Sequence, residues 1–252
     1  MNTYIEKFRV KNYEIDHNGL FKPFAFLNHA QDMGNFHAQS LGFGYNNLIS
    51  SGILWVLSRF HIKFNRLPLW KEELNMETWH KGSDRLFGFR DYSVTDNKGV
   101  EIITATSSWL IIDYKTRKLQ RLDHILGNEI KGYLQKDAIK EPAGKIIMPS
   151  QMKHCGNKIV SISDIDINQH TNNARYLEWA MDSIDPKISI NIQIKELWMT
   201  FNNESLLGEN IDLYCCETPN ATKDTVMQEM PQEIYIEGKR DNSSIFQVKI
   251  VA

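Results

Sequence analysis

Three polar side chains in the second half of the chain are spaced in a way that suits acid–base chemistry. Asp166, Asn168 and His170 occupy every second position of the segment SDIDINQHTNNARYLEW. If the backbone is extended there, the three side chains share one face. Asn172 or Asn173 can cap the helix predicted next, and the partial positive charge at that helix end suits a developing oxyanion. The spacing favours an acyl-transfer site. The alternative is that the aspartate and asparagine hold a turn and the histidine is a surface residue.

The first half of the chain carries a partial copy of this motif. The turn-forming aspartate and asparagine are kept, whereas Leu20 and Leu67 stand where the second half has His170 and Glu204. The two positions that differ therefore carry ionisable side chains in the second half only. This asymmetry is expected after an internal duplication in which the second half keeps the chemistry and the first becomes a binding surface. Two pairs of segments align in the same order: 15–32 with 165–182, and 59–79 with 195–214.

Hydrophobic periodicity predicts one helix followed by several hairpin-linked strands in each half. A helix beginning at Pro23 and ending near Gly42 is indicated by apolar residues at helical spacing. A helix followed by antiparallel strands predicts an α+β fold in which each sheet covers its helix. The predicted strands lie near 60–64, 74–79, 86–96 and 100–113 in the first half, and near 190–201, 209–217, 225–237 and 244–251 after a helix over 172–184.

The composition is that of a globular protein and excludes several classes of partner. Of the 252 residues, 42% are hydrophobic and 24% charged, and the net charge is −2. No global positive field is available to hold nucleic acid or an anionic membrane. No signal peptide or membrane-spanning segment is recognised, so a cytoplasmic location is expected. Three cysteines form no disulfide framework and indicate a reducing compartment, with Cys215 and Cys216 predicted to be core thiols.

Other catalytic chemistries find little support. The chain has no G-x-S-x-G, G-x-G-x-x-G, G-x-x-x-x-G-K-[ST], C-x-x-C or H-E-x-x-H motif. Asp166 and His170 could ligate a metal, but no second histidine clusters with them. The sequence therefore predicts neither a metal nor a cofactor.

The chain resembles the acyl-acyl carrier protein thioesterases, the plastid enzymes and bacterial relatives that end fatty-acid synthesis. The resemblance covers nearly the whole chain. It is carried by YEID, LNHAQD, GFG, ILWV, NRLPLW, ETW and ATSSWLIIDYKTRKLQRL in the first half, and by DIDINQHTNNARYLEW and FNNES in the second. It implies a double hotdog, two tandem units that each wrap an antiparallel sheet around a long helix.

The resemblance also implies residue roles. The family's Asp-x-Asn-x-His falls on Asp166, Asn168 and His170, and its catalytic glutamate falls on Glu204. Plant members have a cysteine after that glutamate, whereas this chain has Ser205, which favours attack by water. In the expected mechanism the glutamate and histidine activate a water, while the asparagine and helix N–H groups hold the carbonyl oxygen.

A division of labour between the halves follows as an expectation. Residues 1–140 are predicted to bind the acyl chain and residues 141–252 to carry the catalytic site. The two leucines that replace ionisable residues make the first half more apolar, so the acyl slot is expected there. Candidate lining residues are Trp55, Met33 and Phe60.

The expected partner is acyl carrier protein, which is strongly acidic as a class and forms part of the substrate. A basic run at Lys115, Arg117, Lys118 and Arg121 is a candidate docking patch, because complementary charge speeds encounter. A solvated hairpin end is the alternative. The sequence leaves the oligomeric state open, and a homodimer is one of the alternatives. The competing functions are an acyl-coenzyme A thioesterase, a hotdog dehydratase or hydratase, and a catalytically inactive acyl-binding module.

Overall fold

The chain folds into two compact units, Met1–Gly144 and Lys145–Ala252. The computed structural model describes residues 3–125, 132, 136–218 and 232–252. Within these ranges, none of the helices combines the length and the apolarity that a membrane span requires.

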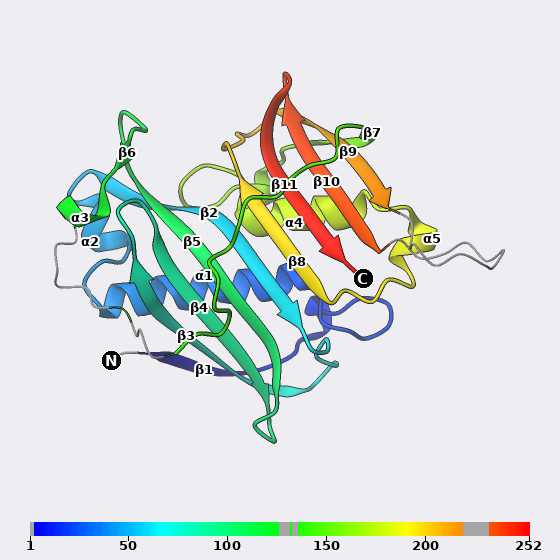
Figure 1. Cartoon of the computed structure of the whole chain (residues 1–252), viewed down its shortest axis with the longest axis horizontal. Helices are drawn as coiled ribbons and strands as arrows, with labels where there is room; N and C mark the ends of the chain where they lie inside the picture. The colour runs from blue at the N-terminus through cyan, green and yellow to red at the C-terminus, as the bar shows by residue number, and fades with distance from the viewer. Residues whose placement is uncertain (1–2, 126–131, 133–135, 219–231) are drawn as a thin grey trace. The chain divides into compact units, whose positions relative to one another are not determined.

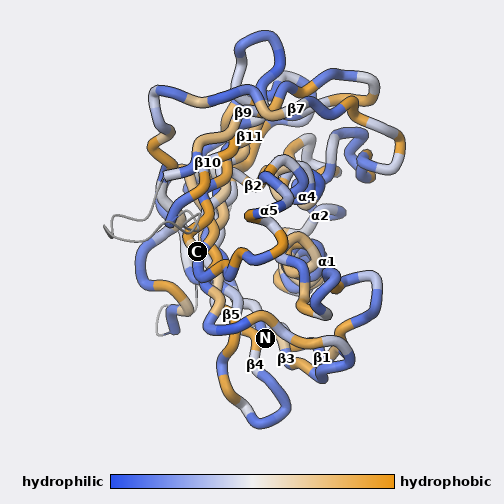
Figure 2. Tube along the Cα trace, turned by 90° about the vertical axis from the view of Figure 1, so that its right-hand side faces the viewer, coloured by the Kyte–Doolittle hydropathy of each residue, from blue (hydrophilic) through white to orange (hydrophobic). Residues whose placement is uncertain are grey.

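The first unit is an antiparallel sheet with one long helix, α1, on one face (Figures 1 and 2). The sheet order is β1-β3-β4-β5-β2, and the short β6 pairs with β5. The elements are β1 (Tyr4–Arg9), a 3₁₀ turn (Asn12–Glu14), α1 (Pro23–Ser40), α2 (Tyr45–Ile49), β2 (Ile53–Phe64), β3 (Glu73–Ser83), β4 (Gly88–Asp96), β5 (Glu101–Asp113), β6 (Leu119–Gln120) and α3 (Leu122–Ile125).

Helix α1 begins and ends where the sequence predicts. Pro23 occupies its first turn, where the missing N–H costs no hydrogen bond. Phe26, Ala30 and Met33 are each at most 1% exposed and face the sheet. Gly42, with φ of 83°, follows the helix and takes the left-handed conformation that favours glycine. The amphipathic pattern therefore places the core of this unit between α1 and the sheet.

The second unit repeats the helix-and-sheet plan with shorter elements. Its sheet order is β8-β11-β10-β9-β7, and α4 lies on one face of it (Figure 2). The elements are β7 (Lys153–Ile159), a 3₁₀ turn (Ile162–Asp164), α4 (Asn173–Asp182), α5 (Pro186–Ser189), β8 (Glu196–Phe201), β9 (Asn210–Thr218), β10 (Glu233–Arg240) and β11 (Ser243–Val251). Most of the strand predicted over 225–237 lies outside the described residues.

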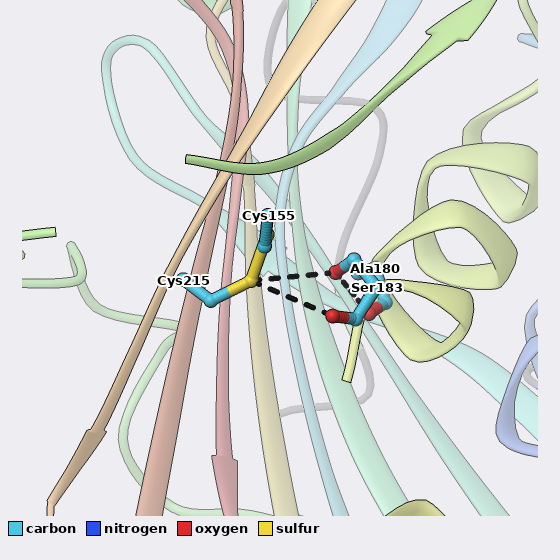
Figure 3. The surroundings of a disulfide bond; sticks show 4 residues. All are labelled: Cys155, Ala180, Ser183 and Cys215. Carbon is cyan, nitrogen blue, oxygen red and sulfur yellow. Dashed lines mark hydrogen bonds between the residues drawn. A yellow bond between two sulfur atoms is a disulfide. The ribbon is translucent and has the colours of Figure 1, made fainter. Parts of the chain in front are cut away.

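A disulfide between Cys155 and Cys215 joins β7 to β9 (Figure 3). The Cα atoms are 6.0 Å apart. Cys155 lies in a bulge, where the β7–β9 register shifts between His154 and Gly156. The Cys215 sulfur also lies 3.6 Å from the Ser183 carbonyl oxygen at the end of α4.

This bond corrects the sequence-based expectation about cysteine. Cys215 is not a core thiol, and the argument for a reducing compartment does not hold. Cys216 is the free cysteine of the chain. The prediction failed because the two bonded cysteines are 60 residues apart, and only the pairing of β7 with β9 brings them together.

Candidate active site

The segment carrying Asp166, Asn168 and His170 is a tight turn and not the extended strand that alternation suggests. The Asp166 N–H donates to the His170 carbonyl oxygen at 2.9 Å, and the Asn168 N–H donates to Asp166 Oδ1 at 2.8 Å. Gln169 has φ of 65°, in the left-handed region. Ile165 pairs with Thr171 in a single antiparallel bridge that closes the turn. The Asp166 carboxylate thus stabilises an Asx turn, which outcompetes the extended conformation.

The turn brings His170 next to Glu204. His170 Nε2 lies 3.2 Å from Glu204 Oε2, and the two side chains are 24% and 34% exposed. His170 lies shortly before the first residue of α4, Asn173, and Glu204 lies in the loop between β8 and β9. The predicted acid and imidazole are therefore adjacent and accessible to solvent. The Asn168 side chain is half-buried in the same turn, and no hydrogen bond to it is found within the described residues.

A buried network of three hydroxyl groups, Thr171, Ser205 and Tyr176, fixes the two segments to each other. Thr171 follows His170 in the chain, Ser205 follows Glu204, and Tyr176 packs against both. All three residues are at most 4% exposed. Ser205 Oγ lies 2.7 Å from Thr171 Oγ1 and 2.9 Å from the Tyr176 hydroxyl. The Ser205 N–H donates to the Tyr176 hydroxyl at 3.1 Å, and the Thr171 N–H donates to the Ser205 carbonyl at 3.0 Å. The network locks His170 and Glu204, one residue before Thr171 and Ser205, at a fixed separation.

Sequence reasoning missed this hydroxyl network. Burial raises the pKa of Tyr176, with hydrogen bonds to Ser205 and Thr171 acting in the opposite direction, so the phenol is neutral near pH 7. Ser205 is fully buried and bonded to neighbours on both sides. The only signal in the sequence was the position of Ser205 directly after the predicted glutamate. Its hydroxyl is occupied in the core and is not presented to a substrate.

The N-terminus of α4 is capped by Asn172, one of the two predicted candidates. Asn172 Oδ1 accepts the Ala174 N–H at 2.8 Å, and the Asn172 carbonyl accepts the Arg175 N–H at 2.9 Å. These two helix N–H groups already have protein partners. The Ala174 and Arg175 N–H groups are therefore not available to a carbonyl oxygen, and stabilisation of that oxygen by this helix end stays a prediction.

Removal of this cap gives a first measurable result. Asn172→Ala is expected to lower the free energy of unfolding by about 1 kcal/mol, because the Ala174 N–H loses its acceptor. Urea denaturation followed by circular dichroism measures the change. Asn172→Asp keeps an acceptor oxygen and adds favourable charge at the helix N-terminus, so its stability should match or exceed that of the wild type. Equal losses in both variants would contradict the capping role.

The first unit contains the same turn without the ionisable pair. The Asp16 N–H donates to the Leu20 carbonyl at 2.8 Å, and the Asn18 N–H donates to Asp16 Oδ1 at 2.8 Å. Gly19, with φ of 75°, takes the place of Gln169. The Phe21 N–H donates to the Pro68 carbonyl at 2.9 Å, as the Thr171 N–H does to Ser205. Both predicted segment alignments therefore correspond to repeated backbone hydrogen bonds, with leucines in place of His170 and Glu204.

The residues predicted to line an acyl slot lie inside the first unit. Met33 and Phe60 are at most 1% exposed, and Phe60 stacks on Tyr92 with ring centroids 5.4 Å apart. Trp55 is half-buried and donates its Nε1–H to the Phe43 carbonyl at 2.9 Å. All three belong to the packed interior between the helices and the sheet, and their role toward an acyl chain stays a prediction.

The predicted docking residues lie around the β5–β6 hairpin. Lys115, Arg117 and Lys118 are exposed on its tip, and Arg117 has φ of 58°. Arg121 pairs with Asp123 just beyond the hairpin. Their contribution to docking stays a prediction. Among the described residues, no group of three or more histidine, cysteine or carboxylate side chains is placed to hold a metal.

Comparison with known proteins gives the family. Residues 1–129 match the family described as Acyl-ACP thioesterase N-terminal domain, and residues 150–247 match Acyl-ACP thioesterase C-terminal domain. The chain is 26% identical over 242 residues to an oleoyl-acyl carrier protein thioesterase of Coriandrum sativum, covering 89% of this chain and 65% of that protein. It is 28% identical over 236 residues to oleoyl-acyl carrier protein thioesterase 2 of Arabidopsis thaliana, covering 86% and 64%. Both relatives are described as chloroplastic, and the chain spans just under two thirds of their length.

Solved structures agree with the fold. An acyl-ACP thioesterase from Bacteroides thetaiotaomicron is 27% identical, with a TM-score of 0.78 over 99% of this chain and 97% of that chain. A 12:0-ACP thioesterase from Umbellularia californica, at 19% identity, gives a TM-score of 0.82 over 99% and 93% and supports the fold alone. The predicted α+β architecture of two hotdog units is confirmed. With both halves matched in order, the chain belongs to the acyl-ACP thioesterase family.

Proposed function

We propose that this protein hydrolyses the thioester of fatty acyl-acyl carrier protein, releasing a free fatty acid and ending chain elongation. The observation that carries the proposal is the contact of 3.2 Å between His170 Nε2 and Glu204 Oε2 in the second unit. A carboxylate and an imidazole at this distance can share the proton of an attacking water. Family membership supplies the thioester as the bond to be cleaved.

The proposed reaction uses water as the nucleophile. Glu204, assisted by His170, removes a proton from the water while its oxygen attacks the thioester carbonyl. The Asn168 amide donates a hydrogen bond to the carbonyl oxygen as negative charge develops there, and the α4 N-terminus adds a favourable field. The C–S bond then breaks, and the thiolate leaves with little need for an acid because thiols are far more acidic than alcohols. The proton held by the Glu204–His170 pair returns to the thiolate or to solvent.

The other two site residues have supporting roles in this scheme. Asp166 holds the turn through its hydrogen bond from the Asn168 N–H, and so aims the Asn168 side chain. Ser205 cannot replace the water, because its hydroxyl is buried in the network with Thr171 and Tyr176. We assign acyl-chain binding to the first half, around Met33 and Phe60, where leucines replace the ionisable pair.

The test is hydrolysis of a panel of acyl-carrier thioesters from short to long chains, compared with the corresponding coenzyme A thioesters. Release of free thiol, followed with a colorimetric reagent, identifies hydrolysis. We expect turnover to be faster with the carrier-bound series. Faster turnover of the coenzyme A series would favour an acyl-coenzyme A thioesterase, and consumption of hydroxyacyl or enoyl chains without thiol release would favour a dehydratase or hydratase. A homodimer and a cytoplasmic location stay predictions, to be tested by light scattering and cell fractionation.

The proposed docking patch gives a second measurable result. The double variant Lys115→Glu/Lys118→Glu is expected to raise KM for carrier-bound substrate by roughly tenfold, because both lysines are exposed and acyl carrier protein is acidic. A small thioester without a carrier should show no change. Lys145→Glu/Lys153→Glu makes the same change in net charge at other exposed sites and serves as the control. An equal rise in KM for both kinds of substrate, or in the control, would contradict the assignment.

A further inference from the structure

The disulfide between Cys155 and Cys215 lies in the two strands that lead to the candidate site. In the second sheet β7 is the edge strand and β9 is its neighbour. From β7 the chain runs through the 3₁₀ turn to His170, and from β9 it runs back through a loop to Glu204. Both residues of the candidate pair therefore lie inside the loop that the disulfide closes, across a sequence separation of 60.

Backbone pairing continues from the disulfide to the site. The β7–β9 ladder begins beside the disulfide and ends at Ile159. The next residue, Val160, exchanges two backbone hydrogen bonds of 2.9 Å with Gly208 and Glu209, in the loop that carries Glu204. The buried hydroxyl network then fixes this loop to the turn that carries the histidine. The disulfide and the candidate site are thus at opposite ends of one run of paired backbone.

The disulfide is accessible to a reagent in solution. Cys155 lies in a bulge of the edge strand and is exposed, and Cys215 is half-buried. Exposed disulfides are in general the labile and regulatory ones. The second unit has a core of its own, because Tyr176 of α4 stacks on Phe246 of β11 with ring centroids 4.9 Å apart, and both are at most 2% exposed. A unit of this size with such a core does not need a cross-link to fold.

The reduced state also has a place in the structure. Cys215 Sγ lies 3.6 Å from the carbonyl oxygen of Ser183, the residue that caps the end of α4, and 3.9 Å from its hydroxyl (Figure 3). A thiol at this position can donate a weak hydrogen bond to that carbonyl. Cys216 follows in the same strand, so its side chain points to the opposite face of β9 and is not placed to exchange with the pair.

We propose that the Cys155–Cys215 bond is a redox-sensitive cross-link, which stabilises the second unit when oxidised and is opened reversibly by a dithiol reductant. A thiolate of the reductant attacks the exposed Cys155 sulfur, and Cys215 leaves as a thiolate that takes up a proton. The second thiol of the reductant then attacks the mixed disulfide and releases Cys155. Two electrons and two protons pass to the protein, and the reductant becomes a disulfide.

Reduction removes a constraint on the unfolded chain, so the folded second unit loses stability. We expect dithiothreitol, added without denaturant, to lower the Tm followed by circular dichroism by roughly 5–15 °C. A thiol reagent, applied in denaturant after the reductant is removed, should titrate one thiol before treatment and three after it. Oxidised glutathione should restore the higher Tm.

The activity measurement rests on the proposed thioesterase function. At a temperature between the two Tm values, the oxidised protein should hydrolyse acyl-carrier thioester and the reduced protein should not. If neither form hydrolyses the thioester at any temperature, the thioesterase proposal fails, and the cross-link is judged by the Tm and the thiol count alone.

Cysteine variants separate the bond from other effects of the reductant. Cys155→Ser and Cys215→Ser should both have the lower Tm and show no response to dithiothreitol. Cys216→Ser removes the free thiol and should respond as the wild type does. The inference is overturned if three thiols titrate before reduction, if reduction requires denaturant, if re-oxidation does not restore the Tm, or if the two forms have equal Tm values. Equal hydrolysis by both forms at the intermediate temperature also overturns it.

Discussion

Replacing Glu204 by glutamine, or His170 by alanine, will lower kcat for acyl-carrier substrate by 10²–10⁴-fold while leaving the protein folded. Each change removes one member of the pair that lies 3.2 Å apart, and removal of a general base costs a factor in this range. Both side chains are partly exposed, so neither variant leaves a buried group without a partner. Steady-state kinetics give kcat, and circular dichroism with urea denaturation verifies the fold.

A second histidine–carboxylate pair in the same molecule provides the matched control. In the first unit, His29 Nε2 lies 2.7 Å from Glu14 Oε1, and the His29 ring stacks on Phe8. Glu14 also accepts the Lys11 N–H at 2.7 Å, which fixes the 3₁₀ turn before the first copy of the motif. This pair joins structural elements, so His29→Gln should change stability and leave kcat close to that of the wild type. Near-normal turnover in both Glu204→Gln and His170→Ala would show that the catalytic assignment is wrong.

Ser205→Ala will separate a structural hydroxyl from a nucleophile. The substitution removes one of the partners of the Thr171 and Tyr176 hydroxyls, which are buried and keep only their bonds to the backbone of residue 205. A buried donor or acceptor left unsatisfied costs about 1–3 kcal/mol, and the free energy of unfolding should fall by that amount. The segments carrying His170 and Glu204 then separate more easily, which should lower kcat. Because both of these side chains are still present, kcat should fall by less than in Glu204→Gln.

Urea denaturation and steady-state kinetics on the same preparations measure both effects of Ser205→Ala. Ser205→Cys keeps a weak donor and acceptor at the same position and should recover part of the stability and activity. If serine were the nucleophile, alanine would remove activity as completely as the loss of Glu204 and would leave stability unchanged. That combination would contradict a positioning role.

Local patterns in the sequence determined much of the fold and failed where distant segments meet. Helix α1 was predicted with both ends because proline, helical spacing and glycine act within one element. Strands β1 and β7 were missed because each is an edge strand. Exposed polar residues recur along both strands, as in Tyr4–Arg9. The disulfide was missed for a related reason, since it depends on the pairing of β7 with β9.

The candidate site shows the same limit. His170 and Glu204 were paired from an internal alignment and a family resemblance, both of which use the order of residues. The Asx turn was misjudged because alternation along a chain does not distinguish a strand from a loop in which an aspartate binds the backbone. Thr171 and Tyr176 were not anticipated, because their contacts with Ser205 join residues 34 and 29 positions apart. Buried Arg90 was not anticipated either, since a charged residue on an alternating strand is ordinarily assigned to the solvent face.

The turn in the first unit repeats the backbone of the candidate site without its ionisable side chains. Its backbone bonds, its left-handed residue at Gly19 and its link from Phe21 to Pro68 are all intact, but Leu20 and Leu67 replace the ionisable pair, and Phe21 and Pro68 replace the hydroxyl residues Thr171 and Ser205. Both leucines are partly exposed, so charged replacements there would meet solvent. A second reaction centre in the first unit would therefore need a histidine and a glutamate in place of the two leucines, together with hydroxyl residues beneath them, on a backbone turn that is already formed.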